Sequence, residues 1–308
     1  MLTDGNGMMV LDKLSTQQVG QVRALAGSCE AGDGYSLEAR LDFGTLETRP
    51  EGSVSDVLWY ENGQLAGFAG LNSYSDPSEV EISILVHPDF RRRGMGHALA
   101  RAVVSACQKR GVRQLLLVVP QESREGAAFA RAMGTRHSHS EYTMDLDATR
   151  IPLFETMPDP VELRPAGAED VPVMAAIVAS AFAGPVEEEE QALVRLMKDL
   201  TRTTYLAARD GRPVGVIQSA VSDGRAFIVH FAVRPEMQGQ GIGQQMLMAI
   251  VRGLLNSGSK WITIEVETDN RNALSLYQRC GFTTVNATDY ELLELPRIPT
   301  APELLFGC

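Results

Sequence analysis

The fold of this chain is decided by the stretch from His230 to Leu247, HFAVRPEMQGQGIGQQML. Its opening run, His230 to Val233, predicts the end of a buried strand, and Pro235 stops that strand because proline cannot donate to a β-ladder. A glycine loop follows from Gln238 to Gly243, after which apolar residues recur at helical spacing. We therefore expect a strand, a glycine loop and a helix N-terminus in direct succession.

This glycine loop predicts a site for a pyrophosphate. A helix N-terminus exposes backbone N–H groups at the positive end of the helix dipole, and glycine lets an anion approach them because it has no Cβ. A P-loop is excluded, since Gln244 rather than lysine follows Gly243. A dinucleotide-binding fingerprint is excluded as well, because Gly239, Gly241 and Gly243 have the wrong spacing.

The same arrangement occurs earlier in the chain, which indicates a duplicated domain. Subtracting 86 from 233, 94 from 241 and 134 from 281 gives 147 each time, so three landmarks share one offset. We expect a first domain over 1–149, a proline-rich linker over 150–160 and a second domain over 161–308.

The hydrophobic pattern of each half predicts the order β-α-(α)-β-β-β-α-β-α-β. Asn62-Gly63 and Asp210-Gly211 each predict a tight hairpin turn, and Tyr142 to Asp147 predicts a strand that closes the first half. Ser15 or Thr16 is expected to cap the first helix. A further helix is expected from Glu187 to Leu200.

Two motifs carry a resemblance to a known family. Val-x-Pro followed by Gln-x-x-Gly-x-Gly resembles the acetyl-CoA loop of the GNAT N-acetyltransferase superfamily, and Ile264 to Phe282, through Asn270 and Tyr277, resembles its second signature. The resemblance covers nearly the whole chain and is strongest to the mycothiol synthase group. It implies an α/β fold of two tandem GNAT domains, each a mixed, mostly antiparallel sheet with helices on both faces. Residues 185–190 and 222–224 depart from that group.

The resemblance implies an N-acetyltransferase that moves acetyl from acetyl-CoA to a primary amine of a small molecule or peptide. Transfer would occur by direct attack and without a metal. Mycothiol synthase, which acetylates the amine of a cysteinyl pseudodisaccharide, is the alternative enzyme, and a non-catalytic acetyl-CoA sensor is the alternative from another class. In the C-terminal half the resemblance assigns cofactor binding to Phe231, Ala232, Val233, Gln238, Gly239, Gln240, Gly241, Ile242, Gly243, Gln244 and Asn270.

Three residues are candidates for catalysis. Tyr277 matches the general acid of the family, which protonates the leaving thiolate; the alternative is core packing against Phe282. Many members carry a glutamate on strand four where this chain has Phe227, so the base must be another residue. His230 is the first candidate and Glu265 the second, although each could instead be a structural strand residue. Asn270 could cap its helix alone.

The N-terminal half keeps the loop but lacks the acid. The position 147 residues before Tyr277 is Ala130, so this half is expected to be degenerate and non-catalytic. Three arginines would add charge for the CoA phosphates. The residues expected to contact CoA in this half are Leu85, Val86, Arg91, Arg92, Arg93, Gly94, Met95 and Gly96.

Composition narrows the class of partner. A net charge of −11 argues against nucleic acid and is compatible with an amine substrate. No apolar run is long enough to span a membrane, and no signal peptide is apparent. Four scattered cysteines without a Cys-x-x-Cys pair are typical of a reducing compartment, so we expect a cytoplasmic monomer or homodimer.

Overall fold

A computed structural model describes residues 6–37, 41, 46, 56–72, 79–147, 151, 160–222 and 224–296. The chain forms two compact units, which we call unit 1 (1–140 with 287–308) and unit 2 (141–286). Of the expected linker at 150–160, only residues 151 and 160 lie among the described residues. Among the helices of the described residues, none is long and apolar enough to cross a membrane.

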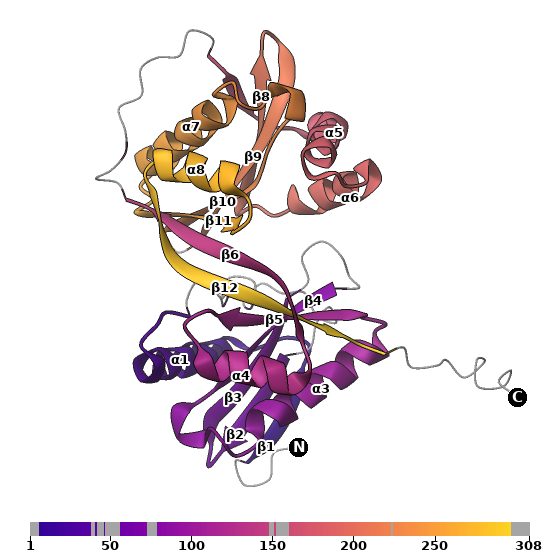
Figure 1. The fold of residues 1–308 in the computed structure, drawn as a ribbon, viewed down its shortest axis with the longest axis vertical. Helices are drawn as coiled ribbons and strands as arrows, with labels where there is room; N and C mark the ends of the chain where they lie inside the picture. The colour runs from indigo at the N-terminus through magenta and orange to yellow at the C-terminus, as the bar shows by residue number, and fades with distance from the viewer. Residues whose placement is uncertain are drawn as a thin grey trace, which may run out of the picture. The chain divides into compact units, whose positions relative to one another are not determined.

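Unit 1 contains a mixed sheet with helices on both faces (Figure 1). Neighbouring strands are antiparallel except for β4 and β5, which are parallel. Its strands are β1 (Gly7–Leu11), β2 (Asp56–Glu61), β3 (Gln64–Asn72), β4 (Glu79–Val86) and β5 (Gln114–Pro120), and its helices are α1 (Thr16–Asp33), the 3₁₀ turn η2 (Pro88–Phe90), α3 (Met95–Lys109) and α4 (Arg124–Met133).

Unit 2 repeats this plan, with β10 and β11 as its parallel pair. Its strands are β7 (Glu162–Pro165), β8 (Arg202–Arg209), β9 (Arg212–Ser222), β10 (Arg225–Val233) and β11 (Trp261–Glu267). Its helices are η4 (Ala168–Asp170), α5 (Val171–Phe182), α6 (Val186–Leu196), η5 (Pro235–Met237), α7 (Ile242–Asn256) and α8 (Arg271–Arg279).

Each sheet is completed by a strand from the other half of the sequence. The closing strands are β6 (Arg136–Leu146) and β12 (Phe282–Glu294). In unit 1, β5 pairs antiparallel with β12, from Thr288 opposite Pro120 to Glu294 opposite Gln114. In unit 2, β11 pairs antiparallel with β6, from Thr263 opposite Asp145 to Glu267 opposite Glu141. The expected strand at 142–147 therefore exists but does not close the first half, and the units differ from the linear division at 149 and 161.

Local signals in the sequence are confirmed where a turn or cap determines them. Both hairpin turns have two consecutive positive φ angles, 51° and 77° at Asn62-Gly63 and 51° and 73° at Asp210-Gly211, as a type I′ turn requires. Ser15 caps α1 in a capping box with Gln18.

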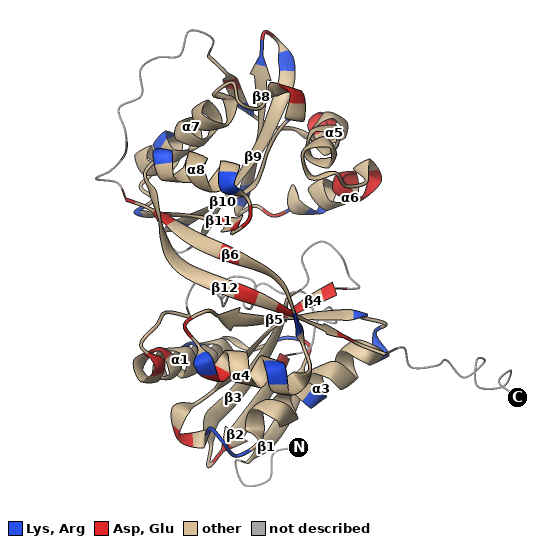
Figure 2. Ribbon diagram, viewed as in Figure 1, with Lys and Arg blue, Asp and Glu red and all other residues tan. Residues whose placement is uncertain are grey.

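Helix α6 is shorter than expected and ends at Leu196. The Asp199 carboxylate accepts hydrogen bonds from the backbone N–H and hydroxyl of Thr201, which favours a turn before β8. Acidic residues from Glu187 onward occupy the first turn of α6, where they complement the helix dipole (Figure 2).

The core of unit 2 shows which face of the sheet each residue occupies. Alternate strand residues such as Ile217, Ile228 and Ile264 pack with α7 and α8. Leu206, Val216 and Ala232 pack instead with α5 and α6 on the opposite face. Because side chains alternate along a strand, these residues assign every other residue of β8 and β9 to one of the two faces. On β10, Ile228 and Ala232 lie on opposite faces although they are four residues apart, so the alternation is interrupted between them.

Candidate active site

Strands β10 and β11 separate in the middle of the unit 2 sheet. Their parallel pairing begins at Arg225 opposite Trp261 and ends at Ile228 opposite Ile264. Directly after this point, β10 has one extra residue relative to β9, between Val229 and Ala232. This β-bulge turns backbone groups out of the ladder at the split.

His230 lies in the bulge in a left-handed conformation, with φ of +46°. A non-glycine residue held there costs on the order of 1–3 kcal/mol, and such strain is concentrated at functional sites. Its Nδ1 atom is fully covered and has no hydrogen-bond partner among the described residues. Burial, and then the charge of Arg202, lower the pKa of His230 below 6.5. The imidazole is therefore neutral, and able to take a proton, at neutral pH.

Tyr277 of α8 packs on the face of the unit 2 sheet that α7 and α8 cover, and it is only 6 % exposed. Its ring centroid lies 6.3 Å from Phe231 and 6.3 Å from Phe282, so the core-packing interpretation describes the ring correctly. The hydroxyl has no hydrogen-bond partner among the described residues, so the phenol proton is not committed to a protein acceptor there. Burial raises the pKa of Tyr277, which keeps the phenol protonated as a proton donor.

The glycine loop leads into the N-terminus of α7. Gly239 and Gly241 have φ angles of 73° and 79°, and Gly241 is the N-cap of a helix that has no side-chain cap. The first N–H groups of α7 are therefore available to a ligand. A Cβ added at Gly239 would meet no heavy atom within 4 Å, so the space in front of these donors fits an anion such as the CoA pyrophosphate.

Side chains in this loop mainly support its backbone. Gln238 Nε2 donates to the Val233 carbonyl at 3.0 Å, and Gln240 Nε2 donates to the Glu236 carbonyl at 3.2 Å. Gly243 allows close packing, since a Cβ there would lie 3.3 Å from Leu276. These residues would therefore hold CoA through backbone groups.

The other predicted residues of this half lie around the split. Asn270 is exposed, and its Oδ1 accepts the Ala273 N–H at 3.1 Å, which confirms the capping interpretation. Glu265 directly follows Ile264, the last residue of β11 that pairs with β10. It is exposed and pairs with Thr143 of β6 on the other side of β11. The side chains of Ala232 and Ile242 are buried, whereas Phe231, Val233 and Gln244 are partly buried.

The N-terminal loop repeats these hydrogen bonds. Arg91 Nε donates to the Val86 carbonyl at 3.0 Å, and Arg93 Nη2 donates to the Asp89 carbonyl at 2.9 Å. Arg91 also makes a bidentate ion pair with Asp33 of α1, with Nη2 2.8 Å from Oδ2. The Arg91 guanidinium is therefore held by protein partners, whereas Arg93 is exposed and uses one N–H donor for the Asp89 carbonyl. Phosphate binding by these arginines stays a prediction.

The remaining predicted residues of this half keep the helix N-terminus intact. Gly94 is the N-cap of α3, with φ of 81°. Arg92 is exposed with φ of 63°, where the other half has Gly239. Leu85 and Met95 have buried side chains, and a Cβ at Gly96 would lie 3.3 Å from Phe129.

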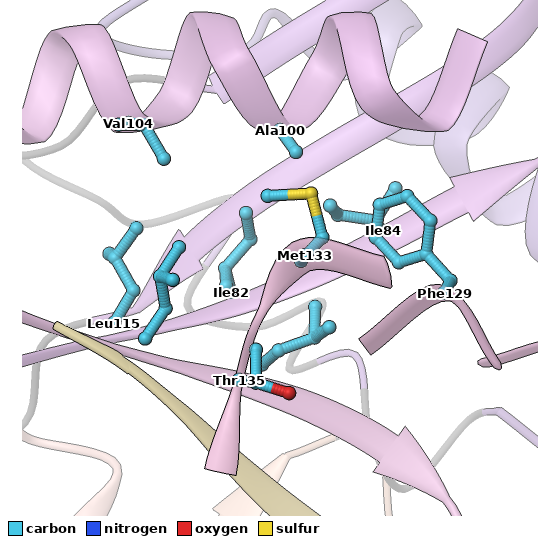
Figure 3. A pocket seen from close by; sticks show the side chains of 10 residues that line it. Ile82, Ile84, Ala100, Val104, Leu115, Phe129, Met133 and Thr135 are labelled. Atoms are coloured by element: carbon cyan, nitrogen blue, oxygen red, sulfur yellow. The ribbon is translucent and has the colours of Figure 1, made fainter. Parts of the chain in front are cut away.

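In the described part of unit 1, the position that corresponds to Tyr277 has no reactive side chain. Ala130, the counterpart of Tyr277, is 1 % exposed and has no acid to offer. An apolar cavity of about 20 Å³ lies nearby (Figure 3), too small for more than about one water molecule. It is lined by Ile82, Ile84, Ala100, Val104, Leu115, Leu117, Phe129, Met133, Thr135 and Leu293.

Two copies of this arrangement match one family model. The Acetyltransferase (GNAT) family model matches residues 22–134 and 173–282, which together make up most of the chain. The chain belongs to the GNAT acetyltransferase family. It is accordingly an acyltransferase that moves an acetyl group to an amine, and members of this family use acetyl-CoA.

Several GNAT relatives resemble the chain over almost their whole length. A mycothiol acetyltransferase of Thermomonospora curvata is 30% identical over 291 residues, covering 91% of this chain and 95% of the relative. A mycothiol acetyltransferase of Actinosynnema mirum is 28% identical over 288 residues, covering 88% and 94%.

Solved GNAT structures show the same tandem fold. A GCN5-related N-acetyltransferase from Sphaerobacter thermophilus superposes with a TM-score of 0.77 at 19% identity, covering 95% of this chain and 98% of the other. A tandem GNAT protein from the clavulanic acid biosynthesis pathway gives a TM-score of 0.70 at 19% identity, covering 96% and 100%. The expected fold class, two tandem GNAT domains, is confirmed.

Two polar residues near His230 were missed by sequence reasoning. Gln218 of β9 is fully buried, and Arg202 of β8 donates to its Oε1 atom at 3.2 Å. The sequence did contain a signal for this pair. Gln218 is a lone amide in an otherwise apolar strand, and a buried amide needs a hydrogen-bond partner.

Proposed function

We propose that unit 2 carries out acetyl transfer from acetyl-CoA to a primary amine of a small molecule, and that unit 1 turns nothing over. The observation that carries this proposal is that the bulge with His230 and the protonated phenol of Tyr277 both belong to unit 2. Unit 1 has an unbroken β3–β4 register from Asn72 opposite Glu81 to Gly67 opposite Val86, and Ala130 in place of the tyrosine.

Each residue of the site has a distinct role in this proposal. The backbone from Gln238 to Gln244 binds the pyrophosphate, and N–H groups at the bulge, around Phe231 to Val233, polarise the thioester carbonyl. His230 takes a proton from the attacking amine, directly or through water. Tyr277 gives a proton to the leaving thiolate. Acetyl-CoA supplies the activated acetyl group and leaves as the CoA thiol, and the proposal requires no metal.

His230 and Glu265 are the two candidate bases, and they flank the split on different strands. We favour His230 because it lies in the bulge at the split and its imidazole is neutral at neutral pH. Because Nδ1 is covered, Nε2 would be the nitrogen that takes the proton. Glu265 is exposed, and the Thr143 hydroxyl donates to it at 3.5 Å. His230→Gln should lower kcat by about 10²- to 10⁴-fold. A larger loss in Glu265→Gln than in His230→Gln would assign the base to Glu265.

The names of the relatives favour mycothiol synthesis as the specific activity. Relatives at 27–31% identity are called mycothiol acetyltransferases. The acceptor would then be the amine of a cysteinyl pseudodisaccharide. The acidic segment at 185–190, which forms the start of α6, is where this chain departs from that group, so the acceptor could differ there.

The test is acceptor-dependent release of CoA from acetyl-CoA. The acceptors would be the cysteinyl pseudodisaccharide, an aminoglycoside, a polyamine and a dipeptide. Turnover with one of them supports an enzyme, and preference for the first by about 10²-fold or more in kcat/KM would identify mycothiol synthase. Tight acetyl-CoA binding without release of CoA with any acceptor would favour the sensor instead.

A further inference from the structure

A row of polar side chains crosses the unit 2 sheet on the face covered by α5 and α6. Leu206 and Val216 mark this face, because both pack with those helices. Thr204 and Gln218 lie two residues from them on the same strands and are register partners of each other. Gln218 Nε2 donates to the Thr204 hydroxyl at 2.8 Å, so the orientation of this buried amide is fixed.

Arg202 extends this row and keeps part of its guanidinium free. Its Nε donates to Asp199 Oδ2 at 3.0 Å, and its Nη1 donates to Gln218 Oε1 at 3.2 Å. The side chain is 22 % exposed, so it is held in place but open to the solvent. Its Nη2 has no hydrogen-bond partner among the described residues, which leaves two N–H donors for a ligand.

The row ends beside the bulge. Gln218 lies directly opposite Val229, the residue that precedes His230. Arg202 is close enough for its charge to lower the pKa of His230, in addition to the larger effect of burial. Through Gln218, Arg202 therefore lies on the β9 side of β10, next to the residue that precedes the candidate base.

We propose that Arg202 is a specificity-determining residue that hydrogen-bonds an oxygen of the acceptor next to the reacting amine. This inference rests on the proposed function of unit 2. The acceptor class is an amine whose amine-bearing carbon is bonded to a second carbon that carries a carbonyl, carboxylate or hydroxyl oxygen, because a guanidinium donates to such oxygens and accepts from none. The fixed positive charge also disfavours an ammonium ion beside it, so the amine is held in its reactive neutral form.

Other ionisable groups near β10 do not substitute for Arg202. Helix α5, from Val171 to Phe182, contains none. Burial and Arg202 account for the lowered pKa of His230. The elements around β10 carry other ionisable groups, none of which is a cause of that shift. They include Asp199 before β8, Tyr205 and Arg209 of β8, Arg212 of β9, Glu265 and Glu267 of β11, Arg252 of α7 and Tyr277 of α8.

The first experiment titrates the imidazole of His230 by NMR in the wild-type chain, Arg202→Met and Arg202→Lys, with His230→Gln to assign the signal. Loss of the positive charge favours the imidazolium, so the His230 pKa should rise in Arg202→Met. Arg202→Lys keeps the charge and should leave it near the wild-type value. An unchanged pKa in Arg202→Met would overturn the placement of Arg202 beside His230.

The second experiment compares acceptors with and without the oxygen, using glycinamide, glycine, 2-aminoethanol and ethylamine. Arg202→Met should lower kcat/KM about 10- to 100-fold for the oxygen-bearing amines, as expected for a lost charge-assisted hydrogen bond, and little for ethylamine. The ranking among the first three identifies the oxygen. Equal losses for all four amines would overturn the acceptor class.

Arg225→Met is the matched control. Arg225 is similarly half-buried on the same sheet, at 29 % exposure, but it bonds to Thr263 and Asp145 at the start of β10. Arg225→Met should leave both the His230 pKa and the acceptor ranking unchanged. If Arg225→Met changed them as Arg202→Met does, the effect of Arg202 would be merely structural. A wild-type chain that releases CoA with none of the amines would count against the proposed function and overturn the acceptor class. The titration would still decide whether Arg202 acts on His230.

Discussion

Units 1 and 2 are two versions of one domain that differ by one residue in the fourth strand. Strand β4 pairs with β3 in constant register to Val86, whereas β10 has an extra residue before Ala232. Before the bulge, the last residue of β4 that pairs with β5 is Ile82, and the last residue of β10 that pairs with β11 is Ile228. The offset between these two residue numbers is 146. Subtracting 86 from 233, beyond the bulge, gives 147, so a single inserted residue creates the bulge.

The comparison separates the loop from the reaction centre. Both loops have a left-handed glycine at the helix N-cap and the same two hydrogen bonds from side chain to backbone. The bulge and the tyrosine, in contrast, both belong to unit 2. The loop therefore persists where the catalytic groups do not, which suggests that each is maintained by a different requirement.

The largest expected effect comes from deleting His230, which makes β10 resemble β4. The pairs on either side of the bulge fall into one register after the deletion, and the strained φ of +46° disappears, so the fold should survive. The deletion removes the imidazole together with the bulge N–H donors, so kcat should fall by at least about 10⁴-fold. Circular dichroism checks the fold, and activity within tenfold of wild type would contradict a role for the bulge.

His230→Gly separates the bulge from the imidazole. Glycine accepts the positive φ, so the bulge stays while the base is lost. Added imidazole should restore part of the turnover in His230→Gly and none in the deletion variant. Rescue of both would mean that the bulge contributes nothing.

A second, smaller effect is expected from Tyr277→Phe. Phenylalanine keeps the packing against Phe231 and Phe282, so only the proton donor is lost and kcat should fall by about 10²-fold. The Kd for acetyl-CoA should not change.

The reverse change, Ala130→Tyr in the Tyr277→Phe variant, should restore no turnover because unit 1 has no bulge on β4. Single-turnover kinetics would test both, and an unchanged rate of chemistry in Tyr277→Phe would exclude the acid role.

A third effect distinguishes the two loops. Gly94 and Gly241 have matching φ angles of 81° and 79°, so alanine at either position should meet the same backbone strain. Each substitution should cost about 1–2 kcal/mol of stability. By calorimetry, only Gly241→Ala should weaken acetyl-CoA binding at the productive site, by about tenfold, which is 1.4 kcal/mol. Turnover that survives in Gly241→Ala and is lost in Gly94→Ala would reverse the roles of the units.

The smallest effect concerns the cavity in unit 1. Ala100 lines it, and the corresponding residue of unit 2 is the fully buried Leu247. Ala100→Leu should raise the Tm by about 2–4 °C if the cavity accepts the larger side chain. Leu247→Ala, its counterpart, should cost about 2–5 kcal/mol. A lower Tm for Ala100→Leu would show that the cavity cannot accept the side chain.

Features set by adjacent residues could be predicted from the sequence. Asn62-Gly63 specifies its turn through φ preferences, and Ser15 with Gln18 specifies a helix start, because the interacting atoms are three residues apart or closer. The two glycine loops were predicted for the same reason.

Features set by distant residues could not be predicted. Alternation identifies 136–146 as a strand but does not say that its partner is β11. The bulge was invisible because the landmarks that gave the constant offset all lie beyond it. Arg202 is 28 residues before His230, and nothing local in the sequence indicates that they approach one another.

The exchanged strands have a consequence for synthesis of the protein. Residues up to Ser140 of unit 1 leave the ribosome well before 287–294, the part of β12 that completes its sheet. At about 5–20 residues per second, this interval lasts roughly 8–30 s. During that time β5 is an unpaired edge, to which a neighbouring nascent chain can add a strand. Slow translation of the second half would therefore favour aggregation of the first.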